Sequence, residues 1–198
     1  KILDCTLRDG GYVNDWMFGE RNIRDTISNL ERAGIDIIEC GFLESVEANK
    51  DRSVFTSVEG MCACFDKGTG MHVGMIALGD MAVEDVPDRE DLGLDGICLT
   101  FHKDEADEEF RQARILMDKG YKVFVQPVGT TNYSITELLE LINRVNELKP
   151  FAFYIVDTLG VLYPNDVDRL FTAVDFCLDR DICLGFHSHN NLQMSFSN

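Results

Sequence analysis

The stretch LDCTLRDGGYVNDW, residues 3–16, begins with apolar residues and changes abruptly to charged residues and glycines. Arg8 and Asp9 follow the apolar residues at once, and Gly10 and Gly11 come next. A charged pair beside two glycines ends a β-strand rather than continuing it. The stretch therefore predicts a first strand that ends in a polar loop carrying an acid and a base.

Similar apolar runs, rich in Ile, Val and Phe, recur along the chain and predict six more strands. The seven predicted strands are 2–6, 35–41, 72–78, 95–101, 121–127, 151–157 and 182–187. Most of these runs are nearly continuous rather than alternating, which is typical of parallel strands covered on both faces. The strands are therefore expected to belong to a buried parallel sheet.

Segments with helical periodicity lie between most of these strands. Ser134 and Glu137 form a capping box before one of them, and Pro164 is a favourable first-turn residue for another. Residues 53–65 predict a weaker helix, and residues 79–94 predict an irregular acidic stretch. The alternation of strand and helix indicates repeated βα units.

Two parallel architectures compete, an open doubly wound sheet and a (β/α)8 TIM barrel. The phosphate-binding pattern G-x-G-x-x-G, typical of the open sheet, is absent from RDGG. Polar residues instead end six different strands, as they do at the rim of a barrel. These residues are Arg8, Asp9, Glu39, Thr100, His102, Gln126, Asp157, Thr158, His187 and His189. We predict an α/β fold of one domain over 1–198, a (β/α)8 TIM barrel truncated after strand 7 and lacking strand 8 and most of helix 7.

The composition restricts the partners of the protein. Eighteen Lys and Arg against thirty-five Asp and Glu give a net charge of −17, which argues against binding nucleic acid or an anionic membrane through a basic face. Seven cysteines are an odd number, and Cys5, Cys40, Cys98 and Cys183 lie in apolar runs. This pattern predicts reduced, buried thiols in a cytoplasmic protein. No apolar run approaches membrane-spanning length.

The motif HSHNN, residues 187–191, carries the clearest chemistry. His187 and His189 are two residues apart on a predicted strand, so both imidazoles point to one side. Together with the carboxylate of Asp9 they offer ligands for a divalent metal ion; the alternative is a solvated histidine pair in a loop. Arg8 either stabilises developing negative charge or forms a surface salt bridge. Glu39 follows two isoleucines in a buried strand, so it needs a partner, and Arg8 is the natural one.

The segments TLRDG (6–10) and HSHNN (187–191) together resemble the DRE-TIM metallolyase superfamily, whose domain is also described as HMGL-like or pyruvate carboxyltransferase. Within that superfamily, LTFHKDEAD (99–107), IVDTLGVLYPNDV (155–167) and GFHSHNNLQ (185–193) are most similar to 4-hydroxy-2-oxovalerate aldolases. The Gly-Glu-Gln that follows the aspartate in the acyl-CoA-dependent synthases is absent here.

The resemblance implies a set of roles. Asp9, His187 and His189 would bind Mn²⁺ or Mg²⁺ rather than Zn²⁺, and Arg8 would stabilise an enolate. Tyr12 stands where the aldolases carry a histidine, the general base. The predicted catalytic residues are therefore Arg8, Tyr12 and Glu39, and the predicted substrate contacts are Arg8, His102 and Thr158.

The expected function is therefore that of a divalent-metal-dependent aldolase-type carbon–carbon lyase, acting on a small 2-oxo acid through a metal-stabilised enolate. Two alternatives remain: a synthase of the same superfamily that condenses an acyl-CoA with a 2-oxo acid, and a non-catalytic metal- or metabolite-binding module. We also expect a homo-oligomer, or fusion to further domains.

Overall fold

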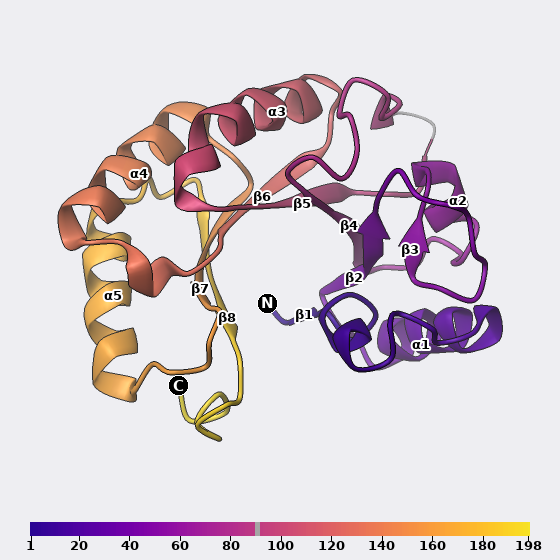
Figure 1. Cartoon of the computed structure of the whole chain (residues 1–198), viewed down its shortest axis with the longest axis horizontal. Helices are drawn as coiled ribbons and strands as arrows, with labels where there is room; N and C mark the ends of the chain where they lie inside the picture. Colours follow the sequence, from indigo (N-terminus) through magenta and orange to yellow (C-terminus); the bar gives the residue numbers. More distant parts are fainter. Residues whose placement is uncertain (90–91) are drawn as a thin grey trace. The chain divides into compact units, whose positions relative to one another are not determined.

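The computed structural model describes residues 1–89 and 92–198, so Glu90 and Asp91 of the predicted irregular stretch lie outside the described residues. The chain divides into two compact units (Figure 1). The first comprises residues 1–99 and 115–122, and the second comprises residues 100–114 and 123–198.

Seven strands follow one another in the sheet in the order β1-β2-β4-β5-β6-β7-β8, which is also their order along the chain. The pairs β1–β2, β2–β4, β6–β7 and β7–β8 are parallel. The strands are β1 (Leu3–Asp4), β2 (Ile37–Leu43), β4 (Met71–Ala77), β5 (Gly96–Phe101), β6 (Lys122–Pro127), β7 (Ala152–Asp157) and β8 (Cys183–Ser188). Sequential parallel strands are the topology of a (β/α)8 barrel, so the predicted fold class is confirmed.

In the described part of the chain, five α-helices connect these strands, and two of them begin where the sequence predicts. Ser134 caps α4: its Oγ accepts a hydrogen bond from the Glu137 amide at 3.3 Å, and the Glu137 carboxylate accepts one from the Ser134 amide at 2.8 Å. Pro164 is the first residue of α5. The helices are α1 (Glu20–Arg32), α2 (Val58–Cys62), α3 (Ala106–Asp118), α4 (Ile135–Leu148) and α5 (Pro164–Cys177).

The predicted helix over residues 53–65 is wrong in its first half. Val54–Phe55 form a short strand, β3, which pairs in parallel with β2, and helix α2 covers only Val58–Cys62. The Ser53 carbonyl accepts a hydrogen bond from the Phe42 amide of β2 at 3.0 Å, which holds this segment extended. A β-branched and an aromatic residue also favour a strand over a helix.

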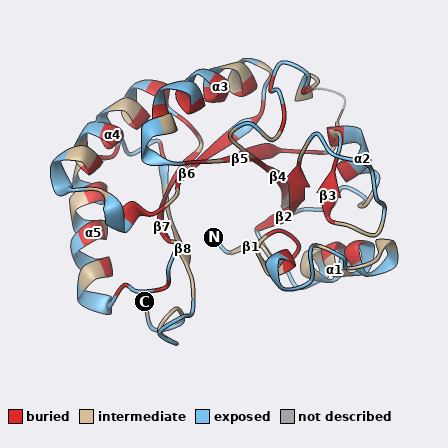
Figure 2. Ribbon diagram, viewed as in Figure 1, coloured by how far each residue is buried: buried red, intermediate tan, exposed pale blue. Residues whose placement is uncertain are grey.

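In the first unit, all seven residues of β2 are buried, and β2 appears red throughout in Figure 2. His72, at the start of β4, is fully buried and stacks on Phe65 with ring centroids 4.0 Å apart. Its Nε2 lies 3.1 Å from Oε1 of Glu31 on α1, while burial lowers the pKa of the imidazole. These contacts give His72 a structural role in the core of the first unit.

All seven cysteines are free thiols, as the sequence predicts. Cys40 and Cys98 are buried, whereas Cys5 is half-buried and Cys183 is exposed. The prediction that Cys183 is buried is therefore wrong. Cys183 begins β8, which among the described strands pairs with β7 alone, so its side chain stays accessible to solvent.

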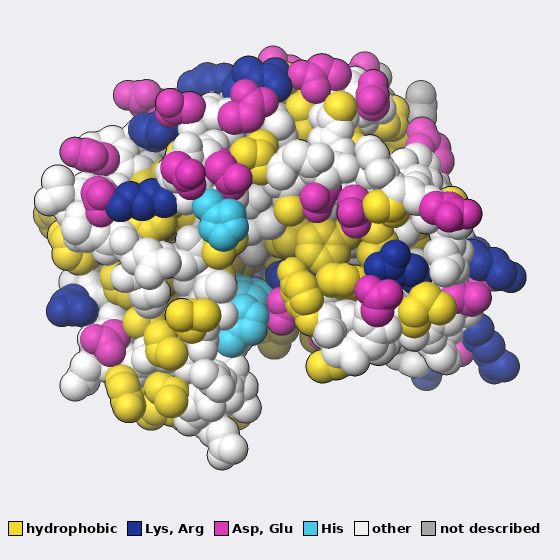
Figure 3. All heavy atoms as spheres, in the orientation of Figure 1, with side chains coloured by type: hydrophobic (Ala, Val, Ile, Leu, Met, Phe, Trp, Pro, Cys, Tyr) yellow, Lys and Arg dark blue, Asp and Glu magenta, His cyan; other side chains and the backbone are white. Residues whose placement is uncertain are grey.

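Acidic side chains are scattered over the face of the molecule seen in Figure 3. Among the described helices, none combines the length and the apolar character needed to cross a membrane.

The second unit has β7 buried along its whole length and α4 packed beside α5, where the Asn146 side-chain amide donates to the Cys177 carbonyl at 2.8 Å. Its least expected residue is Glu109 on α3. This side chain is buried, and neither carboxyl oxygen has a hydrogen-bond partner among the described residues. Burial, aided by the nearby charges of Glu105 and Glu108, raises the pKa of Glu109 to about 8. The carboxyl group is therefore mostly protonated in the folded protein at neutral pH.

Replacing Glu109 should change how stability depends on pH. Between the unfolded pKa of 4.5 and the folded value of about 8, the folded state keeps a proton that the unfolded chain releases. The free energy of unfolding therefore falls as pH rises through this window, by an upper bound of roughly 5 kcal/mol. We expect Glu109→Gln to remove this loss, so that the variant exceeds the wild type in stability at pH 8.5.

Urea unfolding of both proteins at pH 5 and pH 8.5 measures the effect. Glu140→Gln is the control, because Glu140 is an exposed glutamate on α4 and is not among the charges that raise the pKa of Glu109. Parallel pH slopes for wild type and Glu109→Gln would contradict the assignment.

Candidate active site

In the first unit, a buried ion pair joins the end of β1 to β2. The chain turns after β1, where the Cys5 carbonyl accepts hydrogen bonds from the amides of Arg8 at 3.1 Å and Asp9 at 2.7 Å. Arg8 is only 6% exposed. Its Nε donates to Oε2 of Glu39 at 2.8 Å, and its Nη1 donates to Oδ1 of Asp9 at 2.7 Å. The partner that the sequence predicts for Glu39 is therefore present.

Electrostatics fix the charge of Arg8. Burial alone would lower the pKa of the guanidinium, but the carboxylates of Glu39 and Asp9 outweigh it, and the pKa lies above its ordinary value. Glu39 is 1% exposed, and its Oε1 has no hydrogen-bond partner among the described residues. Burial, together with the charge of Glu39, raises the pKa of Cys5 to about 12, so this neighbouring thiol is protonated at neutral pH. The Arg8 guanidinium is therefore a permanent positive charge beside the Asp9 carboxylate.

Tyr12 lies in the 3-10 helix η1 (Asp9–Val13), which follows the ion pair directly. Its side chain is 67% exposed, and its ring meets the edge of Trp16 with centroids 4.9 Å apart. Solvent therefore reaches the phenol, in contrast to the buried guanidinium of Arg8.

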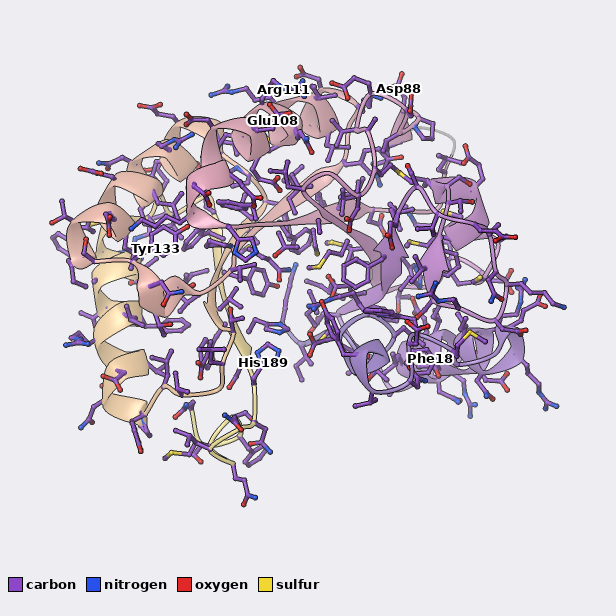
Figure 4. The ribbon with its side chains drawn as sticks, viewed as in Figure 1. Phe18, Asp88, Glu108, Arg111, Tyr133 and His189 are labelled. Atoms are coloured by element: carbon purple, nitrogen blue, oxygen red, sulfur yellow. The ribbon has the colours of Figure 1, made fainter. Side chains whose placement is uncertain are left out.

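In the second unit, the two histidines of HSHNN lie together. His187 is in β8 and His189 follows it, with ring centroids 4.8 Å apart and planes inclined by 66°. Figure 4 labels His189 close to the end of β8. Its Nδ1 lies 2.9 Å from the carbonyl oxygen of Asp157. A carbonyl can only accept, so Nδ1 carries the proton and Nε2 is the nitrogen of the neutral ring that can bind a metal.

The end of β7 supports this arrangement with hydrogen bonds. The Asp157 carboxylate is buried and accepts from the amides of Val161 at 3.0 Å and Leu162 at 3.1 Å. These bonds are those of a turn cap. Thr158 accepts a hydrogen bond at Oγ1 from the Gly129 amide at 2.8 Å, which ties the loop after β7 to the loop after β6.

Sequence reasoning missed Gly160 as part of this region. Its φ is 62°, and a Cβ atom there would lie 2.7 Å from the Asn191 amide nitrogen and 2.9 Å from the His189 carbonyl oxygen. The Gly160 carbonyl also accepts from the Leu192 amide at 3.2 Å. The glycine in DTLG, next to a polar strand end, was the signal available in the sequence.

His102 follows β5 and is exposed. Its amide donates to the Glu105 carboxylate at 2.6 Å, so its backbone begins the helical segment that leads into α3. Contact between His102 and a substrate remains a prediction.

The fold and these side chains define a class: a (β/α)8-type domain whose strand ends carry an Arg–Asp pair in one unit and a His-x-His pair in the other. The HMGL-like family profile matches residues 99–198, half of the chain. The chain belongs to the HMGL-like family.

Named relatives agree with this membership. The chain is 26% identical over 199 residues to oxaloacetate decarboxylase of Mycobacterium tuberculosis, and 27% identical over 208 residues to 4-hydroxy-2-oxovalerate aldolase of Spirochaeta aurantia. Both matches cover 100% of this chain and 59% of the relative, so the chain spans little more than half the length of these proteins. The crystal structure of HMG-CoA lyase from Bacillus subtilis shares the fold, with a TM-score of 0.75 at 13% identity over 100% of this chain and 70% of that one.

Removing the charge of Glu39 should destabilise the first unit. Glu39→Gln leaves the buried Arg8 cation with Asp9 as its remaining carboxylate partner, and breaking a buried pair from one side typically costs about 3 kcal/mol. We expect a loss of at least about 2 kcal/mol in the free energy of unfolding, measured by urea titration.

Asp25→Asn is the control, because Asp25 pairs with Arg21 on the exposed face of α1 at 3.4 Å. Its loss should stay below about 0.5 kcal/mol. Equal effects of the two substitutions would show that the Arg8–Glu39 pair does not stabilise the unit.

Proposed function

We propose that the protein is a divalent-metal-dependent lyase that cleaves a carbon–carbon bond in a small 2-oxo acid. Asp9, His187 and His189 would hold Mn²⁺ or Mg²⁺. The observation that carries the proposal is the contact between Nδ1 of His189 and the Asp157 carbonyl, which selects the tautomer of a metal-binding histidine.

The donor set fits a divalent ion. Two imidazoles and one carboxylate suit a divalent first-row metal and leave coordination positions for a substrate. The preference for Mn²⁺ or Mg²⁺ over Zn²⁺ rests on the family resemblance. When bound, such an ion supplies Lewis-acid polarisation of the 2-oxo group.

Arg8 would stabilise the negative charge that develops on the oxygen of the 2-oxo group. A guanidinium has five N–H donors, and those not directed at Glu39 or Asp9 remain for a substrate. Its high pKa keeps it cationic throughout turnover. Glu39 orients the guanidinium rather than touching the substrate.

The cleavage of a 4-hydroxy-2-oxo acid would need a base and a proton donor. A base removes the proton of the 4-hydroxyl group, the C3–C4 bond breaks, and its electron pair passes to C3 as the aldehyde leaves. A proton added at C3 then gives the shorter 2-oxo acid. We assign the base to Tyr12, which stands where the aldolases carry a histidine, and substrate contacts to His102 and Thr158.

The names of the relatives supply the substrate class. One acts on 4-hydroxy-2-oxovalerate and another on oxaloacetate. Decarboxylation of oxaloacetate uses the same electron sink but releases carbon dioxide in place of an aldehyde and needs no base at a hydroxyl group. It is therefore the second candidate reaction. A cytoplasmic location, and either a homo-oligomeric state or fusion to further domains, belong to the same proposal.

Loss of the Asp9 carboxylate should weaken metal binding. We expect the wild type to bind about one Mn²⁺ per chain, measured by isothermal titration and by electron paramagnetic resonance, and Asp9→Ala to bind at least ten-fold more weakly. Asp25→Ala, which removes an exposed carboxylate of α1, should bind like the wild type. Unchanged Mn²⁺ affinity in Asp9→Ala would contradict the assignment.

The two candidate reactions are separated by supplying 4-hydroxy-2-oxovalerate and oxaloacetate in parallel assays and measuring pyruvate release from each.

Arg8 should matter more for turnover than for metal binding. Arg8→Lys keeps the positive charge but loses the planar fork, and we expect kcat to fall by about 10²-fold or more while Mn²⁺ content persists. Arg21→Lys, on the exposed face of α1, is the matched control. Normal turnover in Arg8→Lys would show that Arg8 serves only as an ion-pair partner.

A further inference from the structure

We propose that Trp16, braced by Arg52 and Ser53, is a positioning residue that fixes the loop carrying Arg8 and Asp9. The inference rests on the proposed function, because a metal ligand at Asp9 is what this loop would position. It assigns a role to the YVNDW segment, which follows the Arg–Asp pair in the sequence and which the proposed chemistry uses only at Tyr12.

The indole closes the loop on itself. Its Nε1 donates to the Arg8 carbonyl oxygen at 2.7 Å, and the Trp16 amide donates to the Gly11 carbonyl at 2.9 Å. The ring also meets Phe42 of β2 edge-on, with centroids 5.5 Å apart. A single residue thus links the backbone on either side of Asp9 to Phe42 of β2.

Gly11 is needed because of this indole. A Cβ atom at Gly11 would lie 2.0 Å from Cδ1 of Trp16, a distance that no packing tolerates. At Gly10 the nearest atom to a Cβ would be Cγ2 of Thr6 at 3.9 Å, an ordinary contact. The two adjacent glycines therefore differ sharply: the second accommodates Trp16, and the first has room for a methyl group.

The backbone of this loop is strained, so surrounding contacts must hold it in its conformation. Asp15 and Trp16 have φ values of 53° and 56°, so two successive residues with side chains occupy the left-handed region. This conformation is costly for such residues and persists only where surrounding contacts over-determine it. Strain of this kind concentrates at functional sites.

Arg52 supplies part of that constraint. Its Nε donates to the Asp15 carbonyl and its Nη2 donates to Oδ1 of Asp15, both at 3.1 Å. Its guanidinium carbon also lies 5.9 Å from the centroid of the Trp16 ring. The planar fork thus holds both strained residues at once.

Ser53 supplies the rest. Its amide donates to the Trp16 carbonyl at 3.1 Å, and its buried Oγ donates to the Leu7 carbonyl at 2.6 Å. Its own carbonyl accepts from Phe42 in β2. The turn ends with Phe18, labelled in Figure 4, whose amide donates to the Trp16 carbonyl at 2.9 Å. Ser53, just before β3, therefore bonds to the loop both before Arg8, at Leu7, and after Asp9, at Trp16.

The consequence is a preorganised ligand. A carboxylate on a mobile loop loses conformational freedom when it binds a metal, whereas one on a braced loop has lost it already. Loosening the brace should therefore weaken metal binding without removing any ligand.

The two glycines give a matched test, and Trp16 is the only tryptophan of the chain, so its fluorescence reports directly on the loop. We expect Gly11→Ala to bind Mn²⁺ about ten-fold more weakly than the wild type and to shift the Trp16 emission to longer wavelength as the indole leaves its place. Gly10→Ala should match the wild type in both measurements. Equal Mn²⁺ affinity in the two glycine variants would overturn the inference.

Trp16→Phe tests the indole donor separately, because it keeps an aromatic ring but loses the N–H that bonds to Arg8. We expect a several-fold weaker Mn²⁺ affinity and a lower kcat with little change in KM. A purely structural role would lower the melting temperature and leave Mn²⁺ affinity unchanged, which would also overturn the inference.

The Asp9→Ala variant distinguishes a failure of the proposed function from a failure of the Trp16 inference. If the wild type binds no Mn²⁺, or if Asp9→Ala binds as tightly as the wild type, the proposed function fails and this inference fails with it. If Asp9→Ala loses Mn²⁺ while Gly11→Ala and Trp16→Phe bind normally, the inference alone fails.

Discussion

The first unit depends on the ion pairs that the buried Arg8 cation forms with Glu39 and Asp9. Removing a charge from water is costly unless the charge is paired, and Arg8 meets this condition with one carboxylate from β2 and one from its own loop. The pairing explains why β1 is short, since the chain must turn at Cys5 to bring the guanidinium to Glu39. It also explains why a charged residue is tolerated in a strand that is otherwise apolar and completely buried.

The sequence predicts the features that depend on local chemistry. The seven strands follow from nearly continuous apolar runs, and the start of α4 follows from a capping box four residues long. The segment around Val54 could not be predicted in this way, because its extended form depends on a hydrogen bond between Ser53 and Phe42. The exposure of Cys183 likewise depends on which strands lie beside β8 rather than on the residues around it.

In the candidate site, too, the sequence predicts some features and only the structure reveals others. Residue types and spacing are enough to select Arg8, Asp9, His187 and His189 and to pair Arg8 with Glu39. They do not reveal that the Asp157 carbonyl sets the tautomer of His189, nor that the indole of Trp16 occupies the space beside Gly11. Both contacts join residues whose separation in the sequence carries no periodic signal, so only a folded structure brings them to notice.

The most direct test of the central claim is a crystal structure of the protein with Mn²⁺, with the ion located by its anomalous scattering. The account predicts a single strong peak bonded to the Asp9 carboxylate and to one nitrogen of each of His187 and His189, with Nε2 as the ligand atom of His189. A manganese ion bound elsewhere, or one that leaves Asp9 or either histidine outside its coordination sphere, would contradict it.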